Sequence, residues 1–225
     1  MRQLKLIGQM NVKVENENIN SLNKLPLSFY EGNDVVQLAK ALLGKVLVTN
    51  FDAKMTVGRI VETEAYNGHT DKASHAYNNK RTKRTEVMYA NGGVAYVYLC
   101  YGIHQMFNIV TNEKDIPHAI LIRAVEPMVG VETMLKRSFK SVYNLELTKG
   151  PGNVARSFGI HTNQSGTSLI SDELFIADDH FSIDENEILA TKRIGVDYAK
   201  DDADLLYRFF LKNNPFVSGK RSLNT

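Results

Sequence analysis

The sequence contains a single cysteine, Cys100, among its 225 residues. One thiol cannot form an internal disulfide framework, and it excludes a zinc site built from four cysteines. We therefore expect Cys100 to pack as a small apolar side chain. Tryptophan is absent, so aromatic packing or stacking depends on 10 tyrosines and 10 phenylalanines. The 5 prolines and 15 glycines are too few for a collagen-like or low-complexity chain.

Long hydrophobic runs are also missing. The N-terminal segment has no apolar run of signal-peptide length, and no stretch approaches the roughly 20 apolar residues that span a bilayer. We therefore expect an intracellular, cytoplasmic protein without a membrane partner. Residues 1–24 are rich in Asn, Lys and Glu and lack periodicity, which predicts a mobile arm before a single domain at 25–225.

The net charge of +2 is unevenly distributed along the chain. Residues 164–207 contain 11 acidic and 3 basic side chains, whereas the middle of the chain is basic. A basic face suits a polyanion such as nucleic acid, but short basic runs are equally typical of solvated loops. Charge alone leaves both interpretations open. The densest basic cluster consists of Lys80, Arg81, Lys83 and Arg84.

Hydrophobic periodicity predicts a mixed fold. Val35, Leu38, Ala39 and Leu42 form one apolar stripe at helical spacing, and Gly44 suits the end of that helix. Short links between the following strands favour antiparallel pairing. The sum is an α+β fold, a single domain around a curved, mainly antiparallel sheet with flanking helices. We expect strands at 45–49, 55–66, 94–101, 106–111, 119–124, 175–177, 192–196 and 206–212, and helices at 130–138 and from residue 152.

Two glutamates stand out in the strand predicted at 55–66. Strand alternation places Glu62, Glu64 and Tyr66 on one face and Val61 and Ala65 on the other. The exposed face of an edge strand would have this pattern. So would a cleft that holds a carboxylate base beside an aromatic ring. The same-face spacing of about 6.6–6.8 Å also falls within the carboxylate separation of inverting glycosidases, although backbone spacing is a poor guide to it.

Metal binding is disfavoured, because the six-residue spacing of His69 and His75 fits neither a helix nor a strand. His75 is better suited to the wall of a pocket. In the strand predicted at 94–101, Tyr96 and Tyr98 share a face, and Tyr101 precedes the turn residue Gly102. A tyrosine at a hairpin tip either lies over the domain's own surface or inserts between base pairs.

Together these segments resemble the alkyladenine DNA glycosylases, also called 3-methyladenine or methylpurine-DNA glycosylases. The resemblance extends from about Leu25 to about Lys220 and rests on the order and spacing of its motifs. They are GRIVETEAY at 58–66, Asp71-x-Ala73-x-His75, YVYLCYGI at 96–103, NIV at 108–110, LIRAVEP at 121–127, GPG at 150–152 and RIGV at 193–196.

The resemblance implies a catalytic base and a pocket for a flipped base. The resemblance implies that Glu64 is the general base that activates water. It also implies that Arg123 lies near that water and the DNA backbone. Tyr66, His75 and Tyr98 enclose the extruded purine.

The resemblance also implies how DNA is recognised. Asn108 would screen bases by clashing with the amino group of guanine, and Tyr101 would fill the vacated position in the duplex. The expected partner is double-stranded DNA with a damaged purine, bound by a monomer associated with the nucleoid. The family needs no metal or cofactor. We further expect phosphate contacts from the cluster of Lys80, Arg81, Lys83 and Arg84.

The resulting hypothesis is a monofunctional base-excision repair glycosylase that hydrolyses the N-glycosidic bond and leaves an abasic site. One alternative is a hydrolase of free nucleosides, which would need neither an exposed Tyr101 nor a basic face. The other is a non-enzymatic binder of damaged DNA, which would retain its function without Glu64.

Overall fold

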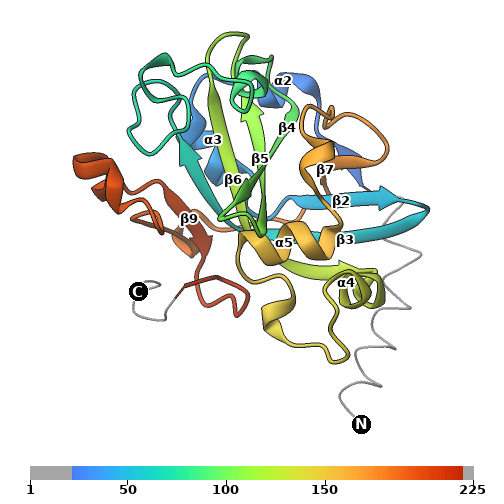
Figure 1. Cartoon of the computed structure of the whole chain (residues 1–225). Helices are drawn as coiled ribbons and strands as arrows, with labels where there is room; N and C mark the ends of the chain where they lie inside the picture. Colours follow the sequence, from blue (N-terminus) through green and yellow to red (C-terminus); the bar gives the residue numbers. More distant parts are fainter. Residues whose placement is uncertain (1–21, 220–225) are drawn as a thin grey trace.

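The computed structural model describes residues 22–219, which form one mixed α+β domain around a curled antiparallel sheet (Figure 1). This confirms the predicted fold class. Nine strands belong to the sheet within those residues. Their order is β1 (Asn23–Lys24), β7 (Leu174–Asp178), β2 (Val46–Phe51), β3 (Lys54–Tyr66), β6 (His118–Val129), β5 (His104–Thr111) and β4 (Val94–Cys100); β9 (Arg208–Leu211) pairs with β3 and with β8 (Ile188–Thr191).

The predicted mobile arm at 1–24 lies largely outside the described residues. Its last two residues, Asn23 and Lys24, pair with Asp178 and Ala177 of β7. The last two residues of the predicted arm are therefore part of the sheet.

Strand β3 is the longest of the described strands, and it pairs with three others. One side of it pairs with β6 over most of its length, and the other side pairs first with β2 and then with β9. The pairing with β6 shifts register at Gly58 and again on both sides of Glu62. Such bulges increase local twist, and β3 changes direction across the molecule in Figure 1. At Gly58 a Cβ atom would lie 2.5 Å from Val125 Cγ1, so only glycine permits this close approach to β6.

The main hydrophobic core lies on one face of the sheet. It contains Ile60 and Ala65 of β3 together with residues of α3 (Val35–Ala41) and α5 (Pro151–Phe158). Helix α3 begins where Asp34 accepts hydrogen bonds from two backbone N–H groups, and it matches the predicted stripe. Two further α-helices of the described part are α2 (Leu27–Tyr30), which the sequence patterns did not predict, and α4 (Val131–Arg137).

The strand predicted at 192–196 was wrong. Strand β8 ends at Thr191, and the next residues leave the sheet. Gly195 has a φ of +77°, and the N–H of Ile194 binds the Glu64 carboxylate instead of a neighbouring strand. The apolar and β-branched residues that resembled a strand therefore form a loop whose backbone reaches the candidate site.

Within residues 22–219, every helix is too short or too polar to cross a bilayer.

Candidate active site

Strand register brings the candidate residues onto one face of the sheet. Glu64 of β3 lies opposite Leu121 of β6, Leu121 lies opposite Asn108 of β5, and Asn108 lies opposite Tyr96 of β4. Directly opposed residues in neighbouring strands project to the same side. A single row across four strands therefore holds a carboxylate, an amide and an aromatic ring. Alternation along β3 and β4 adds Tyr66 and Tyr98 to this face.

Glu64 is completely buried, with 0% of the residue exposed. Its Oε2 accepts a hydrogen bond of 2.8 Å from the Tyr66 hydroxyl, and its Oε1 accepts one of 2.8 Å from the Ile194 N–H. Arg123 Nη1 lies 3.2 Å from Oε2. The alternative of an exposed edge strand is therefore wrong, because β3 is central and this carboxylate is closed off from bulk solvent.

A bulge changes the predicted face of Val61. Ile60 and Glu62 pair with consecutive residues of β6, so Val61 is the extra residue of β3. Ala65 belongs to the main core, but Val61 packs with Ala124 and Phe216 beside Glu62. The prediction that Val61 lies opposite the glutamates was wrong, because strict alternation fails at a bulge.

Arg123 is the extra residue of β6 at the next register shift. Its side chain lies between the two glutamates: Nε donates to Glu62 Oε1 at 2.8 Å, and Nη1 contacts Glu64. The paired bulges thus place one buried guanidinium between two buried carboxylates.

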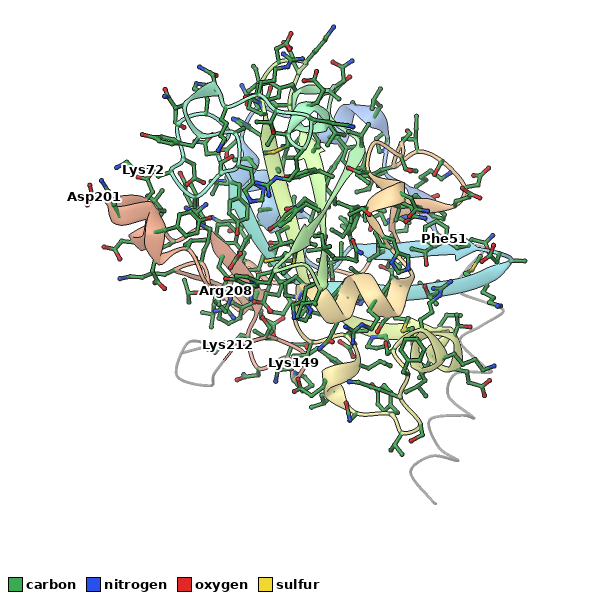
Figure 2. The ribbon with its side chains drawn as sticks, viewed as in Figure 1. Phe51, Lys72, Lys149, Asp201, Arg208 and Lys212 are labelled. Carbon is green, nitrogen blue, oxygen red and sulfur yellow. The ribbon has the colours of Figure 1, made fainter. Side chains whose placement is uncertain are left out.

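Glu62 is the centre of a structural network. It accepts hydrogen bonds from Arg123 Nε, from Arg208 Nε at 2.7 Å, and from the N–H and hydroxyl of Ser218 at 2.6 and 2.9 Å. Burial by itself would raise the pKa of Glu62, but the two arginines and the Ser218 N–H lower it below its ordinary value. Figure 2 shows Arg208 inside the molecule, where β9 meets β3. Glu62 therefore anchors the segment after β9, through Ser218, to the sheet.

His75 and two tyrosines form an aromatic wall. The His75 Nδ1 lies 2.8 Å from the Tyr96 hydroxyl, and its ring meets the Tyr98 ring edge-on with centroids 4.6 Å apart. Burial, with help from nearby Arg84 and Lys80, lowers the pKa of His75 to about 4. The imidazole is therefore neutral at pH 7. Tyr66 interacts electrostatically with Glu64 and with Tyr98, so the three aromatic residues expected to enclose a base, Tyr66, His75 and Tyr98, lie near this carboxylate.

Asn108 is a rigid part of the same face. It is 3% exposed, and its Nδ2 donates to the carbonyl oxygens of Tyr96 at 3.1 Å and Met106 at 3.2 Å. Because both amide hydrogens are directed to backbone carbonyls, the orientation of this side chain is set by β4 and β5.

Tyr101 occupies the tip of the β4–β5 hairpin, as expected. Tyr101 and Gly102 have φ of +51° and +73°, and the Ile103 N–H donates to the Cys100 carbonyl at 3.1 Å. Two successive left-handed residues are typical of a primed hairpin turn. The Tyr101 residue is 90% exposed, which excludes the alternative that it lies over the domain's own surface. Leu99 and Ile103 are also exposed, so the tip is apolar.

The four residues of the basic cluster are not equivalent. Arg81 is ion-paired with Glu86 at 2.7 Å and with Asp115 at 2.8 Å, and it stacks on Tyr89. Lys80, Lys83 and Arg84 are exposed. The Arg84 guanidinium lies 6.0 Å from the Tyr98 ring centroid, so the cluster borders the aromatic wall.

The sequence motifs assigned no role to two features of the site, one ion pair and one backbone N–H. Arg193 forms a buried ion pair with Asp71, and Ile194 supplies the N–H that binds Glu64. Both residues of the pair occur in segments that carry the family resemblance, but nothing in the sequence pairs positions so far apart. Within the described residues, no group of three or more His, Cys, Asp or Glu side chains is arranged to hold a metal ion.

Comparisons with known proteins agree with the sequence resemblance. The profile of the family described as "Methylpurine-DNA glycosylase (MPG)" matches residues 28–215. A protein of Natranaerobius thermophilus named "Putative 3-methyladenine DNA glycosylase" is 44% identical over 196 residues, which cover 87% of this chain and 98% of its own. Proteins of the same name are 44% identical in Clostridium perfringens (88% of this chain, 100% of that one) and 46% identical in Chlamydia abortus (83% and 97%).

Glu62 is expected to be required for folding stability. In Glu62→Gln, the buried Arg123 and Arg208 both lose the negative charge of Glu62, although Arg123 still contacts Glu64, so the free energy of unfolding should fall by about 3–5 kcal/mol in urea titrations. Glu86→Gln removes one carboxylate of an exposed ion pair and should change stability far less. Because the pKa of Glu62 is lowered in the folded protein, its stabilisation is complete above the ordinary glutamate pKa and is lost as pH falls below it. Equal stability of the two variants would contradict this role.

Proposed function

Because the chain belongs to the methylpurine-DNA glycosylase family, we propose that it removes alkylated purines from duplex DNA as the first step of base-excision repair. The observation that carries this proposal is the shared sheet face, where the buried Glu64 lies in register with Asn108 and beside the aromatic wall. The names of the relatives make 3-methyladenine the first lesion to test.

The target bond lies inside the stacked duplex, so the damaged nucleotide must rotate out before it can react. Tyr66, His75 and Tyr98 would receive the extruded ring, and each stacking contact can contribute roughly 1–3 kcal/mol. Electron-rich aromatic faces favour a cationic alkylated base by about 0.5–2 kcal/mol. The low pKa of His75 suits this task, because a neutral imidazole does not repel a positively charged purine.

Glu64 would act as the general base. Its carboxylate would take a proton from a water molecule that attacks C1′ of the sugar, and its negative charge would stabilise the developing oxocarbenium ion. The hydrogen bonds from Tyr66 and Ile194 and the contact with Arg123 hold both oxygens in place. Burial strengthens the interaction of this charge with a cation.

Alkylation already makes the purine a good leaving group, so the enzyme need not protonate it. The mechanism needs no lysine nucleophile, and the product would be an intact strand with an abasic site. Asn108 would select among bases, because an amide held by two backbone carbonyls cannot turn away from the amino group of guanine.

Tyr101 would enter the gap left by the flipped nucleotide, since it projects from a rigid turn next to other apolar side chains. Lys80, Lys83 and Arg84 would contact backbone phosphates. Arg81 would have to exchange Glu86 and Asp115 for a phosphate, so we expect it to contribute least.

Glu64→Gln should abolish excision without abolishing DNA binding. The amide cannot accept the proton from water, so single-turnover excision should fall by about 10²–10⁴-fold or more. The assay uses duplexes that each carry one defined lesion, with the free alkylated nucleoside as a parallel substrate. Binding to a lesion duplex should stay within a few-fold of the wild type. Full activity of this variant would refute the assignment of the base, and release from the free nucleoside alone would favour a nucleoside hydrolase.

Tyr101→Ser should weaken binding to an abasic duplex by about 1–3 kcal/mol, because an aromatic contact with the stack is lost. The thermal unfolding midpoint should barely change, since the side chain is 90% exposed. Phe139→Ser is a matched control, because Phe139 is 94% exposed with a φ of +54° and lies after α4. Equal affinities of the two variants would exclude a wedge at Tyr101.

The basic cluster should control the salt dependence of binding. In the double variant Lys83→Ala/Arg84→Ala, two phosphate contacts are lost, so the slope of log K against log salt should become shallower by about 2. Arg81→Ala is the comparison, and it should change the slope less because that charge is already paired. An unchanged slope in the double variant would mean that this cluster faces away from DNA.

A further inference from the structure

The segment at residues 193–204 packs against the loop that follows β3. Figure 2 shows Lys72 of that loop beside Asp201 of the segment, and their charged groups lie 3.8 Å apart. The Lys72 N–H donates to an oxygen of Asp202 at 2.7 Å, and the Tyr198 hydroxyl donates to the Ala73 carbonyl at 3.1 Å. Two stretches that are far apart in the sequence therefore meet at this edge of the site.

Arg193 is the buried link between them. Its side chain is 0% exposed and that of its partner Asp71 is 1% exposed. Both terminal nitrogens of the guanidinium bind the two carboxylate oxygens of Asp71. They also donate to the carbonyls of Ala65 and Asp202, each at 3.0 Å. Its guanidinium carbon lies 4.9 Å from the ring centroid of Tyr66, a residue of the proposed pocket.

Each end of this ion pair leads to a group of the site. Ile194 follows Arg193 in the chain, and its N–H donates to Glu64 Oε1 at 2.8 Å. Asp71 accepts hydrogen bonds from the N–H groups of Ala73 and Asn67, and so shapes the turn that leads to His75. One bidentate pair thus connects the carboxylate to the aromatic wall.

We propose that Arg193 and Asp71 are a positioning pair for the glycosylase reaction, an inference that rests on the function proposed above. Both side chains are buried, so the pair would act through the groups that it holds. It holds the Ile194 N–H against Glu64 and the His75 turn at a fixed distance from both. A guanidinium is suited to this task, because its planar fork fixes direction as well as charge.

The proposal predicts a specific kinetic signature. A backbone N–H that donates to a carboxylate favours its ionised form, and displacement of Ile194 takes this donor away from the proposed base. The acid limb of the plot of excision rate against pH would shift as a result. Charged and titratable groups face Glu64 from every adjoining element. They are Tyr66 of β3, Tyr98 of β4, Arg123 of β6, Arg208 of β9, and Arg193 and Tyr198 of the 193–204 segment. Glu62 of β3 is linked to Glu64 through Arg123.

Arg193→Lys tests the pair without a change in net charge. A lysine ammonium cannot form the two parallel hydrogen bonds that the planar guanidinium makes with a carboxylate. We expect single-turnover excision to fall by about 10–100-fold, because a shift of about 1 Å in the position of a reacting group can cost this much. The acid limb should shift to higher pH, whereas affinity for an abasic duplex should stay within a few-fold of the wild type. Asp71→Asn, which keeps the shape of the side chain, should show the same signature.

Arg59→Lys is the matched control. Arg59 forms a similar bidentate pair with Asp179, with both side chains 13% exposed, and its other contacts are with Gly44 and Phe181. This variant should lower the unfolding midpoint but leave the acid limb in place. A role in folding alone would make Arg193→Lys behave in the same way.

The outcomes separate this inference from the proposed function. If wild-type protein releases no base from any lesion duplex, or if Glu64→Gln remains active, the proposed function fails. If wild-type protein is active, Glu64→Gln is inactive, and both Arg193→Lys and Asp71→Asn keep the wild-type rate and acid limb, only the positioning role is overturned. A shifted limb in either folded variant, absent from Arg59→Lys, supports it.

Discussion

The burial of two carboxylates within one strand is the constraint on which the rest of this structure depends. Glu62 and Glu64 are both fully buried, so each needs charged or hydrogen-bonding partners inside the protein. Arg123 lies between them, Arg208 completes the charge balance at Glu62, and the C-terminal segment supplies Ser218. The elements that carry these partners, β6, β9 and the segment after it, must therefore pack around β3. The register shifts beside Glu62, which place Arg123 between the glutamates, also increase the local twist of β3.

The two glutamates differ in the groups that they contact. All of the contacts of Glu62 are with groups that hold the domain together, and its lowered pKa is a property of that network. Glu64 contacts the hydroxyl of Tyr66 and a loop N–H, and it faces the side of the sheet that carries Asn108 and the tyrosines. Two identical side chains two residues apart thus have different surroundings, because Glu62 contacts Ser218 after β9 and Glu64 contacts Tyr66.

Local sequence patterns predicted most elements of the fold, including α3 and the long strands β3 and β4. They failed where a side chain or backbone group has a distant partner. Residues 192–196 have the composition of a strand, but Ile194 donates its N–H to Glu64. Val61 alternates correctly in the sequence, but a bulge turns it to the face of Glu62. The sequence also could not show that Arg81, in the densest basic run, is paired with two carboxylates.

The sequence by itself determined the α+β class, the shared face of Glu64 and Tyr66, and the place of Tyr101 at a hairpin tip, because alternation and turn chemistry are properties of neighbouring residues. The exposure of Tyr101 at that tip came from the structure. Motif order also identified the family. Only the tertiary structure decided that Glu64 is buried rather than at an exposed edge, that Arg123 bridges the two glutamates, and that Arg193 connects Asp71 to the site. These features depend on strand register and on ion pairs between distant segments, and charge pairing across such distances leaves no periodic signal in the chain.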